Sequence, residues 1–149
     1  MNGRITRLPR GDGGQALIET ALALPLVLLL SVSVFEFGRA FQHWQILTNA
    51  AREGARLATL PGTSDGAVSS RVQEYLNAGR LYSADLAAVD VVRNAEISTG
   101  EDSTASASVV TVNYPFQFVV LNPVMRLVVG DSEVGEAITM RVSATMRNE

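Results

Sequence analysis

The chain of 149 residues has no cysteine, no lysine and a single histidine, His43. Without cysteine there is no disulfide framework, no thiolate zinc site and no thiol nucleophile. A lone histidine excludes a metal site built on two imidazoles, and it leaves no convincing serine–histidine triad. The sequence therefore predicts a protein that is not an enzyme, with no catalytic residues, no metal site and no cofactor.

Charged side chains are also scarce, because they make up 18% of the chain, against about 25% in an ordinary globular protein. The formal net charge of -3 gives no overall positive field, so nucleic acid is not an expected partner. The hydrophobic share is 47%. At least one part of the chain must therefore be poor in charged side chains.

The dilution is concentrated in one segment, since residues 20–35 carry no charge at all. The apolar character extends from Ala16 to Phe37, which is about 22 residues or roughly 33 Å of helix, enough to cross a bilayer core. Residues 1–14 carry three arginines, and basic flanks stay in the cytoplasm. We therefore expect a cytoplasmic basic leader over residues 1–14, a transmembrane helix over residues 15–37, and the remainder outside the cytoplasm.

Three interpretations of this segment compete. The first is a cleaved secretory signal, for which Ser31-Val32-Ser33 offers a small-residue cleavage site. The second is an uncleaved anchor. The third is a prepilin-type signal, in which the cut precedes the apolar run and the run stays in the product. Glu19 favours the third, because a carboxylate at the edge of a membrane helix is uncommon without a role.

A helical stalk is expected to follow the span over residues 38–60 and to end near Leu60-Pro61-Gly62. One apolar stripe is predicted along it at three- and four-residue steps. The stripe consists of Phe37, Phe41, Trp44, Leu47, Ala51, Ala55 and Ala58. Ala50, Gly54 and Ala58 place small residues four apart, which allows close packing of helices. We expect this packing within the chain's own core somewhat more than between subunits.

Residues 61–149 are predicted to form an extracytoplasmic α+β head. A short helix is expected after a cap at Ser64 or Asp65, with strands over 88–93, 110–116 and 138–146 and a loop over 98–106. Pro115 indicates a sheet edge or a bulge, and Asn122-Pro123 indicates a turn. The predicted fold class is thus α+β and pilin-like: a long N-terminal helix packed against a small antiparallel sheet with one short helix.

The segment from Gly14 to about Ala58 resembles the TadE-like minor pseudopilins of tight-adherence (Tad/Flp-type) pilus systems. Three features carry the resemblance: Gly14-Gln15-Ala16-Leu17-Ile18-Glu19 at the head of the apolar helix, the exit Phe35-Glu36-Phe37-Gly38-Arg39, and the later Ala51-Arg52-Glu53-Gly54-Ala55-Arg56. The glycine followed five positions later by glutamate is the pattern that prepilin peptidases recognise. In this chain Thr20 occupies the position after the glutamate, where the family often has an aromatic residue.

The resemblance implies a role in assembly of a type IV-related pilus for adhesion. A prepilin peptidase would cut between Gly14 and Gln15, and Glu19 would pair with the new N-terminal amine of a neighbouring subunit during assembly. Pro25 would kink the membrane helix. The implied partners are the prepilin peptidase, other pilins or pseudopilins, the inner-membrane assembly platform and membrane lipid. The implied location is the bacterial inner membrane, single-pass, with a periplasmic head and incorporation into an extracellular pilus left open. The alternative is an uncleaved single-pass protein with a periplasmic binding module.

Overall fold

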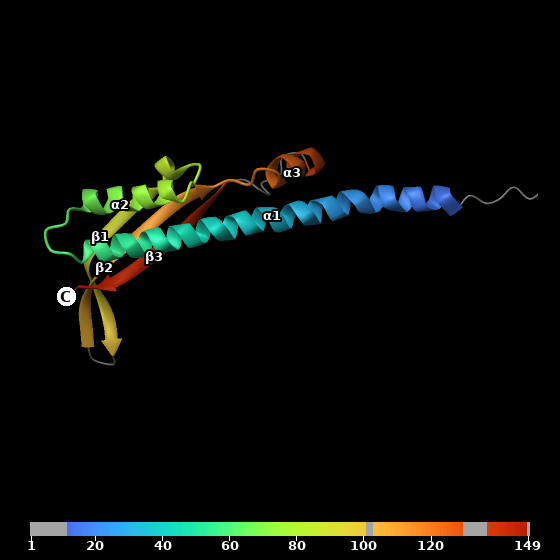
Figure 1. Cartoon of the computed structure of the whole chain (residues 1–149). Helices are drawn as coiled ribbons and strands as arrows, with labels where there is room; N and C mark the ends of the chain where they lie inside the picture. The colour runs from blue at the N-terminus through green and yellow to red at the C-terminus, as the bar shows by residue number, and fades with distance from the viewer. Residues whose placement is uncertain (1–11, 101–102, 130–136, 149) are drawn as a thin grey trace, which may run out of the picture. The chain divides into compact units, whose positions relative to one another are not determined.

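The computed structural model describes residues 12–100, 103–129 and 137–148, and the chain divides into two compact units, residues 1–35 and residues 36–149 (Figure 1). Most of the predicted leader, residues 1–11, lies outside the described residues. In the first unit the described residues form one element, the N-terminal part of helix α1 (Asp12–Ala58). The second unit holds the rest of α1, two further α-helices and a three-stranded sheet. The α+β fold class is thereby confirmed.

Helix α1 continues through Pro25 and ends at Ala58, two residues before the predicted end of the stalk. Its sequence is dominated by alanine and leucine, the residues that favour a helix most. Leu60 precedes Pro61, and a residue before proline is disfavoured in the helical conformation. Gly62 then takes a positive φ of 79°, which glycine adopts without steric cost.

Helix α2 (Asp65–Ala78) begins as the sequence predicts, because the Ser64 side chain accepts a hydrogen bond from the Ala67 amide at 3.2 Å. It buries Val68, Val72 and Leu76, which recur at the spacing of one helical face. A short 3-10 turn, η1 (Ala84–Leu86), then leads into the sheet.

The sheet is antiparallel in the order β1-β2-β3, with β1 at Ala88–Gly100, β2 at Ser103–Phe116 and β3 at Ile138–Arg147. The predicted loop over residues 98–106 is wrong, because most of it belongs to a β1–β2 hairpin. Pairing of β2 with β3 stops at Ala107↔Arg147, so the hairpin beyond that point has only two strands. One face of this part carries Ala95, Ile97, Ala105 and Ala107. Because three of these four side chains are only alanine methyl groups, the alternation is a weak signal for a strand in the sequence.

Pro115 lies on β2, the central strand, yet its environment is that of an edge. The β1–β2 register begins at Ala88↔Asn113, so β1 does not reach Pro115. On the other side Pro115 pairs with Thr139 of β3. The missing amide of proline is tolerated where a strand has only one neighbour, in agreement with the expectation of an edge.

The predicted turn at Asn122-Pro123 is also wrong, since these residues lie in helix α3 (Leu121–Val129). The first helical hydrogen bond runs from the Val124 amide to the Val120 carbonyl at 3.2 Å. Pro123 is thus in the first turn, where the amide that proline lacks has no partner within the helix in any case. A proline here starts a helix instead of turning the chain.

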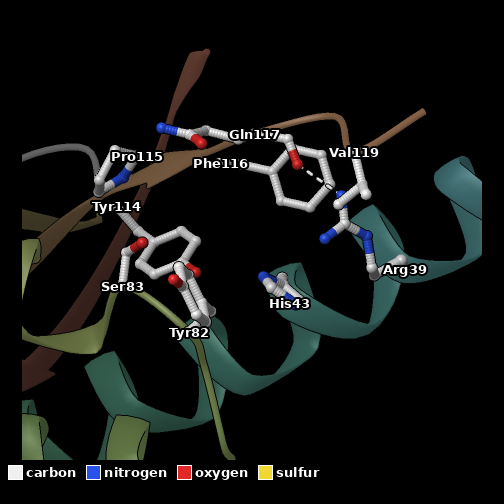
Figure 2. Close-up of a pocket in the computed structure, with 9 residues that line it drawn as sticks. All are labelled: Arg39, His43, Tyr82, Ser83, Tyr114, Pro115, Phe116, Gln117 and Val119. Carbon is white, nitrogen blue, oxygen red and sulfur yellow. Dashed lines mark hydrogen bonds between the residues drawn. The ribbon is translucent and has the colours of Figure 1, made fainter. Parts of the chain in front are cut away.

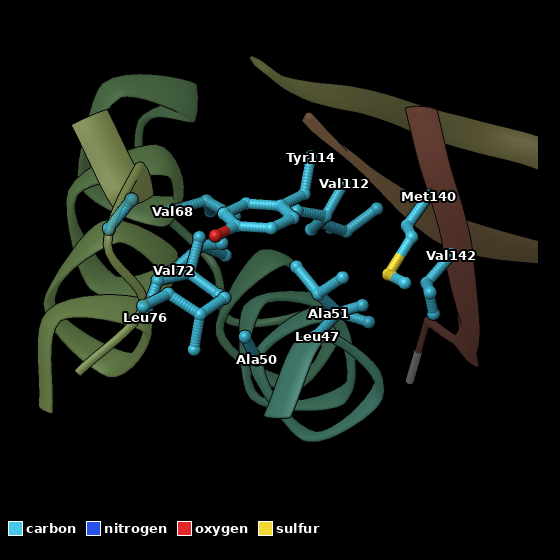
Figure 3. Packing of buried hydrophobic residues seen from close by; sticks show 14 of the residues in the cluster. Leu47, Ala50, Ala51, Val68, Val72, Leu76, Val112, Tyr114, Met140 and Val142 are labelled. Carbon is cyan, nitrogen blue, oxygen red and sulfur yellow. The ribbon is translucent and has the colours of Figure 1, made fainter. Parts of the chain in front are cut away.

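The hydrophobic core of the second unit forms where α1 and α2 pack against one face of the sheet (Figure 3). From α1 come Leu47, Ala50, Ala51, Ala55 and Ala58, and from the sheet come Val110, Val112, Tyr114, Phe116, Met140 and Val142. A Cβ added at Gly54 would lie 2.6 Å from Cγ2 of Val72 and 3.2 Å from Cγ1 of Val110. Gly54 therefore permits α1 to approach both α2 and β2.

The first half of the predicted apolar stripe is wrong. Phe37, Phe41 and Trp44 are 61%, 63% and 45% exposed, whereas the stripe from Leu47 onward is buried. Phe41 and Leu47 are separated by two three-residue steps. At 3.6 residues per turn, this spacing places their side chains roughly 120° apart around the helix axis. The core face of α1 instead continues from Leu47 back to Glu36, so the aromatic residues lie to one side of it.

Arg93 fixes the C-terminal end of α1. Its guanidinium donates to the carbonyl oxygens of Ala58 and Thr63 at 2.9 and 2.7 Å and pairs with Asp65 at 2.6 Å. The side chain reaches these groups from an irregularity in β1, where the register shifts and Asn94 has a φ of 55°. Arg93 thus joins the end of α1, the following loop and the start of α2.

Candidate functional site

The predicted processing residues, Gly14 and Gln15, lie in the first turns of α1 and are exposed. A Cβ added at Gly14 would meet no heavy atom within 4 Å. Because α1 begins at Asp12, the bond between Gly14 and Gln15 is inside the helix. Neighbouring glycines make this turn weak, since each costs about 1 kcal/mol of helix stability relative to alanine.

Glu19 is exposed on the same helix. It lies in a shallow depression of about 350 Å³ that is otherwise lined by Ala16, Thr20, Ala23, Leu24 and Val27. Among residues 12–100, 103–129 and 137–148, no cation forms an ion pair with it. Its carboxylate is therefore available, at the surface of an apolar helix, to a positive group from another molecule.

The surface of this segment is apolar and uncovered. The most hydrophobic 18-residue window of α1 has a mean hydropathy of 2.2, and none of it is buried against the rest of the protein. The hydroxyls of Thr20, Ser31 and Ser33 each donate to the carbonyl four residues earlier at 2.8 Å. In lipid every polar group needs such an internal partner. This segment is therefore compatible with a bilayer.

Pro25, Ala50, Gly54 and Ala58 complete the predicted set. Pro25 lies inside α1, with helix on both sides of it. Ala50, Gly54 and Ala58 are buried in the core of the second unit. The close approach that small residues permit is used here between α1, α2 and the sheet.

A second cluster, which the sequence did not predict, surrounds Glu36. The Glu36 side chain is only 1% exposed and pairs with Arg39 at 3.1 Å. Its two carboxylate oxygens accept hydrogen bonds from the amides of Val119 and Val120 at 3.1–3.2 Å. These two amides immediately precede α3, where a negative charge is favoured by the helix dipole. Glu36 therefore fastens α1 to the β2–α3 connection.

Arg39 extends this cluster to β2. It donates to the carbonyl of Gln117, and its guanidinium carbon lies 4.9 Å from the centroid of the Phe116 ring (Figure 2). A cation over an aromatic face is attractive. Glu36, Arg39 and the chain at 116–120 consequently form one connected unit, which we call the Glu36 clasp.

His43, one turn beyond Arg39, faces a cavity of about 290 Å³ between α1, the loop before η1 and the end of β2 (Figure 2). Its ring meets those of Tyr114 and Phe116 edge-on, with centroids 5.6 and 5.2 Å apart. Burial, and secondarily the charge of Arg39, lower the pKa of His43 below its ordinary value of 6.5. His43 is thus a half-buried, neutral ring in an aromatic wall near pH 7.

Two nitrogens at this cavity are buried without a hydrogen-bond partner, Nε of Arg39 and Nδ1 of His43. Most buried polar atoms in proteins are satisfied. Among the residues that the structure describes, no group of three histidine, aspartate or glutamate side chains is arranged to hold a metal ion. The cavity is therefore an aromatic pocket with unused hydrogen-bonding capacity and no cluster of acidic groups.

The sequence does contain a signal for Glu36. It precedes Leu47 by eleven residues, which is about three helical turns, so both residues lie on the same face of α1. From the sequence alone Glu36 is only a charge in the exit from the apolar run. A buried carboxylate needs partners, and the two amides that bond it are more than 80 residues away in the sequence.

The fold and the exposed segment together define a class: an α+β domain carried on one apolar helix that is compatible with single-pass membrane anchoring. Residues 14–56 match the family model described as TadE-like protein. This stretch is therefore TadE-like, and the resemblance drawn from the sequence is confirmed. The match lies within α1 and includes no residue of α2, α3 or the sheet. No curated protein and no solved structure matches the chain.

Proposed function

We propose that this protein is a minor pseudopilin that takes part in assembly of a Tad/Flp-type pilus. The observation that carries the proposal is the coincidence of the TadE-like stretch, residues 14–56, with the uncovered apolar part of α1. The N-terminus lies in the cytoplasm, because the basic residues precede the span, and the second unit lies in the periplasm. Its work is structural: it binds other subunits and lipid and catalyses no reaction.

Processing by a prepilin peptidase at Gly14–Gln15 is part of this proposal. The peptidase must open the first helical turn, and the two glycines before Gln15 make that turn easy to unwind. A Cβ added at Gly14 meets no heavy atom within 4 Å among the residues that the structure describes. An effect of substituting Gly14 on cleavage therefore reports on contact with the peptidase or on the unwinding of this turn, and not on packing within the described part of the chain.

The decisive experiment is mass spectrometry of the mature N-terminus in the native host. A chain that begins at Gln15 supports the pseudopilin. A chain that begins at Met1 or Asn2 supports the uncleaved anchor, and one that begins near Val34 supports an ordinary secretory signal. Gly14→Leu should retain the leader, whereas Gly38→Leu, at a second glycine of α1 with no atom within 4 Å of an added Cβ, should be processed normally.

Glu19 supplies the assembly contact in this proposal. Its exposed carboxylate would pair with the Gln15 amine of an adjacent subunit, which sets register more than it adds stability, because desolvation opposes the attraction. Glu19→Ala should enter the membrane normally and lose crosslinks to neighbouring subunits. Thr20→Ala is the matched control, since that hydroxyl bonds only the Ala16 carbonyl of its own helix. Normal crosslinking by Glu19→Ala would contradict the pairing role.

A further inference from the structure

Helix α3 is apolar in sequence along all but one face. Only two of its nine residues, Asn122 and Arg126, are polar, and they are four apart, on one face. None of its described side chains belongs to the hydrophobic core of the second unit. Just before it, Val119 is 63% exposed, and Phe37, whose ring contacts that of Phe118, is 61% exposed. Exposed apolar side chains that gather in this way mark an interaction site.

The Glu36 clasp fixes where this surface begins. The amides of Val119 and Val120 are held by the carboxylate of Glu36, and Glu36 follows the uncharged run of α1 directly in the sequence. Phe118 lies edge-on to Phe37 with ring centroids 6.3 Å apart. The start of α3 is thus fastened to the residue at which the proposed membrane span ends.

We propose that the segment from Phe118 into α3 lies in the headgroup region of the bilayer as a second contact with the membrane, held there by the Glu36 clasp. This inference rests on the proposed function in one respect, that α1 spans the membrane. The occupant of the surface is lipid because Glu36 follows the uncharged run directly in the sequence, and Phe37 and Val119, at either side of the clasp, are 61% and 63% exposed.

The dimensions of α3 agree with an interfacial position. Nine residues give a helix of roughly 14 Å, about half of the hydrocarbon thickness, so α3 is too short to cross the bilayer. A helix with one polar face and an apolar remainder lies in the interface plane instead. The exposed Arg126 on the polar face suits the headgroup layer.

The test uses the full chain in vesicles of equal parts phosphatidylcholine and phosphatidylglycerol, with brominated lipids as quenchers of tryptophan fluorescence. The chain has one tryptophan, so Trp44→Phe provides a silent background. Three single-tryptophan probes are then made at exposed apolar positions: Leu22→Trp in the span, Val119→Trp before α3, and Leu60→Trp beyond the far end of α1. Between Glu36 and Ala58 α1 rises about 33 Å, so Leu60 is well separated from the clasp.

The expected result is strong quenching of Leu22→Trp by bromines near the bilayer centre, quenching of Val119→Trp by bromines near the headgroups to at least half that extent, and no quenching of Leu60→Trp. If Leu22→Trp is quenched while Val119→Trp behaves like Leu60→Trp, α1 inserts but α3 does not touch lipid, and the inference is wrong while the proposed function stands. If Leu22→Trp is not quenched, the span itself is wrong and both proposals fail.

Discussion

Replacing Glu36 with alanine should destabilise the second unit far more than the loss of an ordinary ion pair. The change removes the acceptor for the amides of Val119 and Val120 and the partner of Arg39 at once. Each amide hydrogen bond is worth about 1 kcal/mol net. Breaking a fully buried pair by removing one partner costs about 3–5 kcal/mol. Arg39 keeps 26% of its side chain exposed and still bonds Gln117, which puts the expected loss near the lower end, at about 3 kcal/mol.

Glu74→Ala is the matched control. Glu74 also pairs with an arginine three residues away, Arg71, at 2.9 Å, but its side chain is 69% exposed. An exposed pair of this kind contributes little to stability, because water and salt screen it. Each variant therefore removes a carboxylate that pairs with an arginine three residues away. They differ because the Glu36 carboxylate is buried and also bonds the amides of the β2–α3 connection.

Urea unfolding of the full chain in detergent, followed by Trp44 fluorescence, measures the loss. With an m-value of about 1–3 kcal/mol/M, Glu36→Ala should lower the midpoint by roughly 1–3 M, while Glu74→Ala should leave it nearly unchanged. Hydrogen exchange measures the local effect. The exchange rates of the Val119 and Val120 amides should rise about tenfold for each 1.4 kcal/mol lost from the free energy of local opening. Equal midpoints for the two variants, with unchanged exchange at Val119 and Val120, would refute the Glu36 clasp.

Three further changes test other parts of the fold. Gly54→Ala forces a Cβ against the buried, stiff Val72 and should cost about 1–3 kcal/mol of overpacking, offset by about 1 kcal/mol of helix propensity, whereas Gly38→Ala should stabilise; urea midpoints distinguish them. His43 has a lowered pKa in the folded protein, so the unfolded chain binds its proton first: stability should be full above pH 6.5 and fall below it, and His43→Gln should flatten this part of the pH profile of the melting temperature. Arg93→Lys cannot reproduce three directed contacts and should lower the free energy of unfolding by about 1–2 kcal/mol, and an unchanged melting temperature would rule out its role at the end of α1.

The elements that sequence alone predicted are those with a strong local pattern. The uncharged run of α1, the cap and apolar spacing of α2, and the alternation along β3 each follow from neighbours a few residues apart. In β3 the alternating residues Met140 and Val142 are indeed buried. Such patterns arise because one face of each element packs against the core.

The elements that it missed depend on distant partners. The hairpin beyond Ala107 has an apolar face made mostly of alanine, which is a weak pattern, and the proline in the first turn of α3 fits a turn of the chain equally well. Glu36 looks like a surface charge until the chain at 119–120 is placed against it. The exposure of Phe41 and Trp44 also depends on a distant partner, because the position of the sheet decides which side of α1 is covered.

The two attachments of α1 within the second unit have a mechanical consequence. Glu36 and Arg93 hold opposite ends of this part of the helix, and the small residues between them, such as Ala51 and Gly54, interlock with α2 and the sheet. Tension applied along α1 at Phe35 is therefore carried in shear, with all of these contacts loaded together instead of one after another. Pulling the domain apart through α1 therefore requires breaking the whole interface, and Glu36 is the contact nearest to the applied load.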